Sequence, residues 1–419
     1  MTRFFTSRSG ELPLDADLGY RLEVVAPHVN RLRTLSCSEC IIDDFSHFSN
    51  RPAPLLETFH VLPYDNLHSN CLPLPALFNR NSLSLRELVV SSYNPFPNNR
   101  FQNLSSFNLH LPLNDIDFVF WTPLLRMLRD SSQLEELFLR FSAIPFHPPP
   151  VRDIPTPVTL HSLRKLHLRG ISSSLTRRFL NFIDLVPNGV AMQFTNIVPE
   201  FDWMSPPTLP PELSLHAMTS LEIVYGPAHE IIIQGTNPGV RIRIARASDS
   251  DATYADTFSR LVGRMTPQLP LRELWIHIKG GDGYKLPPLS KFPHLEKLVV
   301  RVTMNGNPIY RLLQMLDIDR HVPCSLLSTL DLSGVPNVDH LVKVLRARSK
   351  AGCRLGKLRL GKNYGLTEGI VKLGLRDYVG ELEFSNEDEE PCGMELPDVC
   401  TTELGGWWEP WTKHEVRFS

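Results

Sequence analysis

LEELFL (residues 134–139) and LRKLHL (residues 163–168) carry the same arrangement of apolar and variable positions. In each, an aliphatic residue is followed by two variable positions, an apolar residue, one variable position and another apolar residue. The last two apolar side chains are two residues apart, so they lie on one face of a short strand. The pattern therefore predicts a strand with one buried face and a third apolar side chain that anchors the chain before it.

The same pattern recurs along the chain. Ten further instances begin at Leu32, Leu56, Leu85, Leu104, Met218, Leu271, Leu295, Leu327, Leu355 and Val379. Two degenerate repeats, around Val190 to Phe194 and Val240 to Ile244, fill the two long gaps. With these, the 347 residues from Leu32 to Val379 divide into thirteen steps. The mean step is about 27 residues, inside the range of roughly 20 to 29 for leucine-rich repeats.

Segments with apolar residues at spacings of three and four lie between several of these strands and predict helices. They are residues 122–128 with a Thr122–Pro123 start, residues 174–185, residues 251–265 and residues 337–350. This alternation predicts an α/β leucine-rich-repeat solenoid of about 12 to 14 repeats. Its concave side would be one curved parallel sheet, and its convex side would consist of helices and Pro-rich loops. The alternative is an ordinary α/β domain, which rarely needs so many strands.

The composition argues against several classes of protein. Hydrophobic residues make up 42% and charged residues 21% of the chain, as in a protein that folds along most of its length. The net charge of −2 gives no overall attraction to nucleic acid or to an anionic membrane. Seven widely spaced cysteines do not resemble a disulfide framework. We therefore expect a cytoplasmic or nuclear protein without nucleic-acid or membrane partners.

The sequence lacks the common catalytic motifs. It has no His-Glu-x-x-His pair and no Gly-x-Ser-x-Gly turn, and its fifteen histidines form no cluster with ligand spacing. Cys37 and Cys40 have the spacing of a zinc knuckle, but no second pair follows. We expect a non-catalytic protein with no metal and no cofactor.

Candidate binding residues follow from the strand geometry. Side chains between and beside the buried apolar pair should face the open concave side, where such solenoids bind other proteins. Aromatic and basic types, which are enriched at binding hot spots, give these candidates for partner binding: Phe138, Arg140, Lys165, His167, Arg169, Trp275, His277 and Arg301. Arg140, Lys165, His167 and Arg169 form a basic patch that suits an acidic or phosphorylated peptide. The alternative is a solvated strand surface with charges spread for solubility.

Several phrases resemble a known family. LREL (residues 85–88 and 271–274), LEEL (residues 134–137) and LRKLHL (residues 163–168), with the variable repeat spacing, resemble the leucine-rich-repeat F-box proteins of mushroom-forming fungi. RSGELPL (residues 8–14), an apolar helix expected after it, and PHVNRLRTL (residues 27–35) resemble the segment that follows the F-box there. The F-box itself is missing, which suggests either a paralogue that lost it or a sequence that starts too late.

The resemblance implies a function. In that family the F-box docks to the Skp adaptor of a cullin (SCF) ubiquitin ligase, while the repeats bind the substrate protein. This chain would then be the substrate-recognition part of such a receptor, with a protein substrate on its concave face. The Skp adaptor and cullin would be partners if an F-box exists upstream. A stand-alone leucine-rich-repeat interaction protein without a ligase connection is the alternative.

The sequence divides into three expected segments. Residues 1–30 would form an N-terminal cap that resembles the post-F-box segment, and residues 31–385 the repeat array. Residues 386–419 would form a tail that is first acidic and then rich in Trp. Because a terminal repeat leaves its core open, Trp407, Trp408 and Trp411 either fold back as a cap or form a free aromatic interaction motif.

Overall fold

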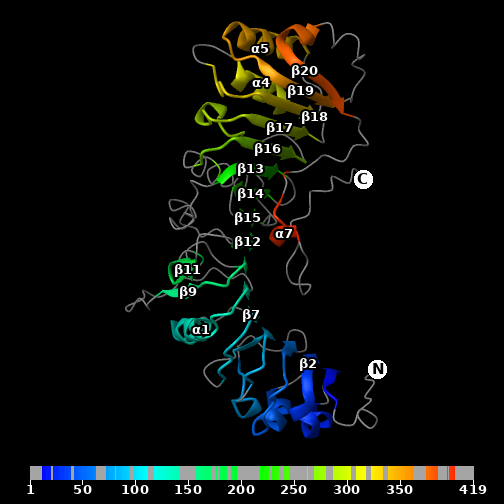
Figure 1. The fold of residues 1–419 in the computed structure, drawn as a ribbon, viewed down its shortest axis with the longest axis vertical. Helices are drawn as coiled ribbons and strands as arrows, with labels where there is room; N and C mark the ends of the chain where they lie inside the picture. The colour runs from blue at the N-terminus through cyan, green and yellow to red at the C-terminus, as the bar shows by residue number, and fades with distance from the viewer. Residues whose placement is uncertain are drawn as a thin grey trace. The chain divides into compact units, whose positions relative to one another are not determined.

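The computed structural model divides the chain into two compact units, residues 1–202 (unit 1) and residues 203–419 (unit 2). Both are drawn in Figure 1. The structure describes residues 12–19, 22–38, 42–62, 72–80, 82–94, 99–111, 118–141, 157–170, 176, 179–185, 190–195, 218–225, 229–235, 239–244, 262, 269–279, 286–302, 308–317, 322–333, 338–361, 374–385, 394 and 396–401.

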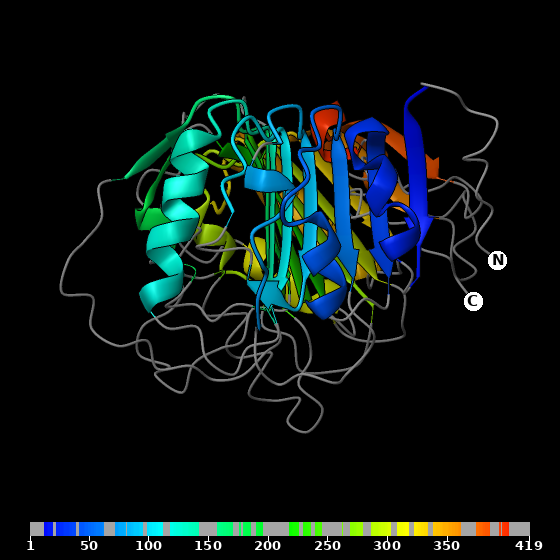
Figure 2. The ribbon, with the colours of Figure 1, turned by 90° about the horizontal axis from the view of Figure 1, so that it is seen from below.

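Unit 1 is built on a sheet in which every described pair of neighbouring strands is parallel. In spatial order its strands are β1 (Leu14–Leu18), β2 (Leu32–Ser38), β3 (Thr58–Leu62), β5 (Glu87–Ser91), β7 (Ser106–Leu111), β8 (Glu136–Phe141), β10 (Lys165–Arg169) and β12 (Ala191–Thr195). Figure 2 shows the strands from β2 to β8 side by side, from blue to cyan. Spatial order therefore follows chain order.

The remaining elements of unit 1 are short. Two small parallel sheets pair β4 (Leu72–Pro73) with β6 (Tyr93–Asn94) and β9 (Val158–Leu160) with β11 (Ile183–Leu185). The helix α1 (Phe118–Asp130) packs against β9. The 3-10 helices are η1 (Leu22–Val24), η2 (Ala26–Arg31), η3 (Ile42–Phe48) and η4 (Phe78–Arg80). The described connections between strands are therefore mostly 3-10 turns, with α1 as the one long helix among them.

Unit 2 has a mixed sheet. In spatial order its strands are β15 (Gly239–Ile244), β14 (His229–Gly235), β13 (Met218–Tyr225), β16 (Glu273–Ile278), β17 (Lys297–Val302), β18 (Thr329–Ser333), β19 (Leu355–Gly361) and β20 (Val379–Ser385). The strands from β13 through β16 to β20 are parallel, but β14 is antiparallel to both β13 and β15. The prediction of a wholly parallel sheet is therefore wrong at β14.

Unit 2 also contains a long helix that confirms a prediction from the sequence. This helix, α5 (Val338–Lys350), occupies the segment predicted as residues 337–350. It packs against β19 and against α4 (Pro308–Leu316), which in turn contacts β17. Figure 1 shows α4 and α5 next to each other beside these strands. The other described helices of this unit are η7 (Leu289–Lys291), η8 (Arg376–Tyr378) and α7 (Asp398–Thr401).

Other helix predictions are corrected or lie outside the described residues. The helix α1 begins at Phe118, so Pro123 lies inside it and not in its first turn. In the segment 174–185, residues 179–181 are helical but Ile183–Leu185 is the strand β11. Of residues 251–265 only Val262 is described, and it is helical and buried. The apolar helix expected after residue 14 is wrong, because β1 occupies this place.

The apolar pattern sets the register of both sheets. In unit 1, the middle apolar positions pair laterally in the order Phe59, Leu88, Phe107, Leu137 and Leu166. In unit 2, they pair in the order Leu221, Leu274, Leu298, Leu330 and Leu358. All ten side chains are at most 2% exposed, so each column forms part of a core. This confirms the α/β class, with mostly parallel strands and few helices.

One backbone hydrogen bond recurs just before the strands. The amide of Glu135 donates to the carbonyl of Ser105, and the amide of Arg164 donates to the carbonyl of Glu135, each at 2.8 Å. In unit 2 the amide of Glu296 donates to the carbonyl of Arg272 at 2.8 Å, and the amide of Ser328 donates to the carbonyl of Glu296 at 2.9 Å. The carbonyl stands each time at the second position of the pattern. We call this the lead-in bond.

The described part of the C-terminal tail is short. It comprises Met394 and residues 396–401, in which Met394 and Cys400 of α7 are buried. Trp407, Trp408 and Trp411 lie outside the described residues. No helix in the described segments is long and apolar enough to cross a membrane.

Candidate binding face

The variable positions of the pattern lie together on one face of each sheet. Within a strand they alternate with the buried apolar side chains, and lateral pairing aligns them from strand to strand. In unit 1, for example, Glu136 pairs with Lys165, Phe138 with His167, and Arg140 with Arg169. We call this the polar face of each unit. All eight candidate binding residues belong to it.

Six of the eight candidates are less exposed than the sequence suggested. The structure buries Phe138, Lys165, His167, Trp275, His277 and Arg301, with exposed fractions from 1% to 9%. Only Arg140 is exposed, and Arg169 is intermediate. The prediction that all eight face open solvent is therefore wrong for these six. A large side chain on a strand loses exposed area to its neighbours on the adjoining strands, because these strands are only about 4.8 Å away. A role in partner binding stays a prediction for all eight.

On unit 1, the middle of the polar face is closed by lateral contacts. The Lys165 Nζ lies 3.7 Å from the Glu136 Oε1, and the two side chains are 2% and 16% exposed. Burial raises the pKa of Glu136, and the charge of Lys165 opposes this shift. The His167 ring packs edge-on against Phe138, with centroids 6.0 Å apart, and its Nε2 lies 2.8 Å from the Thr195 Oγ1. Lys165 and His167 are therefore engaged within the sheet.

The ends of the strands in unit 1 carry a different group. Ser91, His110, Arg140 and Arg169 pair laterally in this order across β5, β7, β8 and β10. The Ser91 Oγ lies 3.0 Å from the His110 Nδ1. Burial, and then the charges of Arg140 and Arg169, lower the pKa of His110 to about 4. Burial, and then the charge of Arg169, also lower the pKa of Arg140. We call His110, Arg140 and Arg169 the basic column.

On unit 2, cations of the polar face lie beside carboxylates. Arg301 donates to both oxygens of Asp331, at 2.8 and 2.7 Å, across neighbouring strands. Lys357 donates to the Glu383 Oε1 at 2.6 Å, which raises the pKa of Lys357 and lowers the pKa of Glu383. The His277 Nε2 lies 3.1 Å from the Glu222 Oε1 in a buried pair. This part of the face therefore neutralises much of its own charge.

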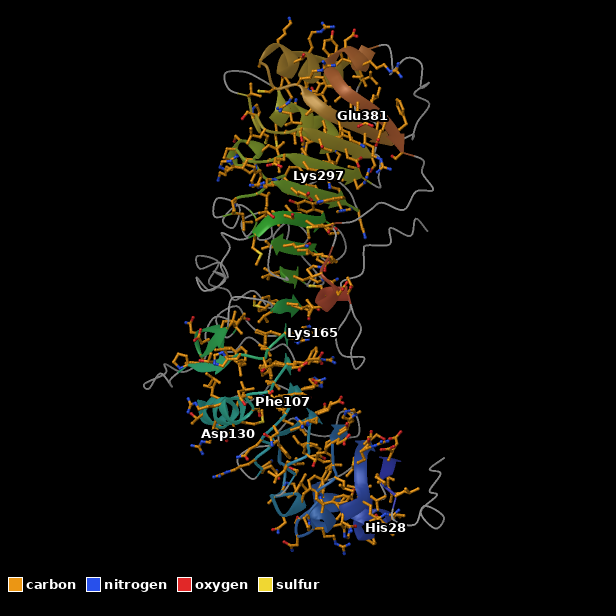
Figure 3. All side chains as sticks on the ribbon, viewed as in Figure 1. His28, Phe107, Asp130, Lys165, Lys297 and Glu381 are labelled. Atoms are coloured by element: carbon orange, nitrogen blue, oxygen red, sulfur yellow. The ribbon has the colours of Figure 1, made fainter. Side chains whose placement is uncertain are left out.

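Trp275 is the centre of a small cluster on unit 2. Its indole nitrogen donates to the Glu273 Oε2 at 3.3 Å, and the Lys297 ammonium lies 4.6 Å from the ring centroid. Lys297 also lies 3.7 Å from the Glu273 carboxylate. Figure 3 labels Lys297 in this unit and Lys165 in unit 1. Trp275, expected to face solvent, is thus covered in part by a cation on the adjoining strand.

Sequence reasoning missed two features of this face. The pattern places His110 on the concave side at the position of Arg140 and Arg169, but His110 was not selected among the eight candidates for partner binding. The buried pair of Arg241 and Glu230 was also missed, because it joins β14 and β15 in the antiparallel part of the sheet. The pairing could not be predicted, because β14 lies outside every predicted repeat.

The described residues offer no metal site. None of their groups of His, Cys, Asp and Glu brings together three side chains that could hold an ion. Cys37 is buried in β2 at an apolar position of the pattern, and Cys40 lies outside the described residues. The candidate site is thus a set of charged and aromatic side chains on a strand face.

Comparison of the chain with family models, curated proteins and solved structures finds no match in any of the three. Functional proposals therefore depend on the geometry of the two polar faces and on the sequence resemblance.

Proposed function

We propose that the chain is a leucine-rich-repeat solenoid that acts as a non-catalytic protein-binding scaffold. The observation that carries this proposal is the recurrence of one strand unit. The same apolar positions are buried, the same lead-in bond recurs, and the same variable positions face one way in both units. Such a sheet displays side chains from many strands at fixed spacings, which suits the recognition of an extended protein surface.

The proposal extends to a specific role. By resemblance to the F-box proteins, the scaffold serves as the substrate-recognition part of a receptor for an SCF cullin ubiquitin ligase. The partner protein lies on the polar face, where Arg140 of unit 1 is exposed and Arg169 is intermediate. A stand-alone interaction protein is the second candidate. It is favoured by β1, which stands where the resemblance implies a helix.

Affinity purification with matched variants tests the proposal. Tagged wild-type chain, Arg140→Glu with Arg169→Glu, and Arg86→Glu with Arg164→Glu are incubated with fungal lysate, and bound proteins are quantified by mass spectrometry. Arg86 and Arg164 are exposed arginines of unit 1 outside the basic column, so the control makes the same change of charge. We expect partners that are lost only from the first variant.

The outcomes separate the two roles. Skp adaptor and cullin retained by all three proteins would support the ligase receptor. Specific partners without adaptor or cullin would support the stand-alone scaffold. The same set of proteins bound equally by wild type and both variants would contradict binding at this end of the polar face.

A further inference from the structure

The last strand of unit 2 leaves the apolar core open at its end. In β18 and β19 the side chains of Leu330 and Leu358, at the fourth position of the pattern, are at most 1% exposed. Leu382 has the same position in β20 and pairs laterally with Leu358, but its side chain is partly exposed. β20 is also the last strand in the order of the sheet (Figure 1). Because a terminal strand has a neighbour on one side only, Leu382 presents an apolar surface beside the edge of the sheet.

The backbone of β20 has hydrogen-bonding groups at this edge. At the third position of the pattern, the amide of Lys357 in β19 donates to the carbonyl of Ser328, which leads into β18, at 2.9 Å. Third-position groups therefore point to the preceding strand. Since successive residues of a strand point their backbone groups to opposite edges, fourth-position groups point the other way. In β20 the third position is Glu381, which pairs with Lys357, and the fourth is Leu382. The amide and carbonyl of Leu382 thus point away from β19, and no strand in the described segments pairs with that edge.

The two carboxylates of β20 are flanked by cations of β19 on one side. Lys357 pairs laterally with Glu381, and Arg359 pairs laterally with Glu383. The Lys357 Nζ lies 2.6 Å from the Glu383 Oε1 and 3.8 Å from the Glu381 Oε2. Within the sheet, Arg359 stands between two acids, because its other lateral neighbour is Asp331. At the outer edge, cations on an added strand would continue this alternation of charge. Figure 3 labels Glu381 on β20.

The first strand of unit 1 has protective features that β20 lacks. β1 has five residues, follows Pro13, and has an irregular register between Leu14 and Asp15. Its apolar Leu18 is 1% exposed. Short strands, prolines and irregular register are devices by which proteins keep an edge from pairing with another chain. β20 has seven residues, contains no proline and keeps a regular register with β19. It is therefore the edge better suited to accept another strand.

We propose that the outer edge of β20 binds an extended segment of a partner protein, in which Lys or Arg alternates with apolar residues, as an additional strand of the sheet. In this mode of recognition, main-chain hydrogen bonds supply affinity and alternate side chains supply specificity. The apolar side chains of the segment cover Leu382, and its cations lie beside Glu381 and Glu383. This site goes beyond the binding at the polar face proposed above, because it uses the backbone edge of one strand.

Two other occupants carry a charge that β20 repels. In an antiparallel pair of two β20 strands centred on Leu382, Glu381 of one copy would stand opposite Glu383 of the other, and like charges in this position destabilise a sheet. The segment that directly follows β20 is also acidic, with the sequence EDEE at residues 387–390. Residues 411–419, WTKHEVRFS, contain both basic and apolar residues. A peptide of this sequence is therefore included as a competitor in the test.

Fluorescence anisotropy with the intact chain tests the site. The first probe is a fluorescent pool of degenerate nonapeptides in which Val, Ile or Phe alternates with Lys or Arg. A second pool has Glu in place of Lys and Arg, and a third has the composition of the first with its apolar residues clustered at one end. The variants are Glu381→Gln and Glu381→Lys. The control is Glu135→Lys, which makes the same change of charge at an exposed glutamate of unit 1. Thermal midpoints verify that each variant is folded.

We expect the alternating basic pool to bind at least about tenfold more tightly than the acidic and clustered pools. Glu381→Lys should weaken this binding by about 5- to 30-fold, because it replaces an attractive lateral pair by a repulsive one. Glu381→Gln should have an intermediate effect, and Glu135→Lys should change the affinity less than twofold.

Hydrogen exchange of the full chain locates the contact. The amide of Leu382 should exchange rapidly in the free protein, because it points away from β19, and slowly once the basic pool is bound. The amide of Glu381 points toward β19 and should be protected in both states. It is therefore the internal control for an intact β20.

Other results would overturn the inference in different ways. Equal binding of the basic and acidic pools would exclude recognition by the two carboxylates. Equal binding of the clustered pool, or an equal loss in Glu135→Lys, would indicate general charge attraction in place of an added strand. Binding that leaves the Leu382 amide unprotected would place the peptide elsewhere. Slow exchange of this amide in the free chain, with competition by the peptide of residues 411–419, would replace the partner by the chain's own segment. Protection that increases with protein concentration would replace it by a second copy.

Discussion

The polar faces of the two units differ in how their charged side chains are paired. On unit 2, the Arg301 side chain pairs with the Asp331 carboxylate on the neighbouring strand, and Lys357 pairs with Glu383. On unit 1, Arg140 has the position in the pattern that Arg301 has on unit 2, and it pairs laterally with Arg169. Register and apolar core are alike in both units, so the difference lies in the side chains chosen for the polar face. Opposite charges on neighbouring strands stabilise a sheet, whereas like charges directly opposite each other destabilise it.

The variant with the largest expected effect on stability removes a carboxylate from unit 2. Asp331→Ala leaves the guanidinium of Arg301 buried without its bidentate acceptor. Breaking a buried ion pair in this way costs about 3 to 5 kcal/mol. Urea denaturation followed by circular dichroism measures the loss. The double variant Arg301→Met with Asp331→Ala should recover much of it, and a single variant that costs under about 1 kcal/mol would contradict the role of this pair.

The next test compares how much an equivalent core leucine contributes to the free energy of unfolding in each unit. Leu166→Ala in unit 1 and Leu298→Ala in unit 2 each remove a fully buried side chain at the same position of the pattern. Each should lower the free energy of unfolding by about 2 to 5 kcal/mol, because a cavity remains. Denaturant titration of both variants provides the measurement. A cost below about 0.5 kcal/mol in either unit would show that its register is wrong.

A third test uses the pH dependence of His110. The unfolded chain takes up a proton on this residue near pH 6.5, whereas the folded chain does so only near pH 4. Its contribution to stability is therefore fully present above pH 6.5 and is lost as the pH falls toward 4. At pH 5, His110→Gln should reduce the acid-induced loss by about 1 kcal/mol, after allowance for screening at a half-buried site. Parallel pH profiles of both proteins would contradict this placement of the ring.

The smallest expected effect is a gain in stability. Arg140→Gln removes one of two like charges on neighbouring strands, so it should raise the free energy of unfolding by about 0.2 to 1 kcal/mol. Thermal unfolding at low ionic strength gives the clearest reading, since salt screens the repulsion. Arg164→Gln is the matched control and should leave the midpoint unchanged. A destabilised Arg140→Gln would show that Arg140 is a structural residue, and the contrast between the units would then disappear.

The positions of the strands could be predicted from the sequence more accurately than the exposure of the side chains on the polar faces. The spacing of Leu134, Leu137 and Leu139 reports burial directly, because a strand alternates its sides at every residue. For this reason the apolar pattern also gave the lateral register. No predicted repeat covered β14, because its three consecutive isoleucines lack the spacing of the pattern, so neither this strand nor its antiparallel direction was predicted. At β1, Leu14, Ala16 and Leu18 have the spacing of a strand, so the prediction of a helix at this place was wrong.

The exposure of the candidate site could not be read from single strands. Phe138 and Trp275 are buried by neighbours that are distant in sequence, such as His167 for the first and Lys297 for the second. Arg140 remains exposed on the same face. The choice between these outcomes depends on which side chains stand opposite on the next strand. The strand register determines which side chains these are. The exposure of a candidate residue in such a sheet is therefore best judged together with its lateral neighbours.

The lead-in bond joins the approach of each of these strands to the approach of the preceding strand. It connects the carbonyl of Glu135 to the amide of Arg164 in the same way as the carbonyl of Ser105 to the amide of Glu135. Excision of residues 135–163 would bring Arg164 to the place of Glu135, with the same bond available. The shortened chain would place His110 directly beside Arg169. Such an excision would change which side chains stand together on the polar face while the hydrogen bond between neighbouring approaches is kept.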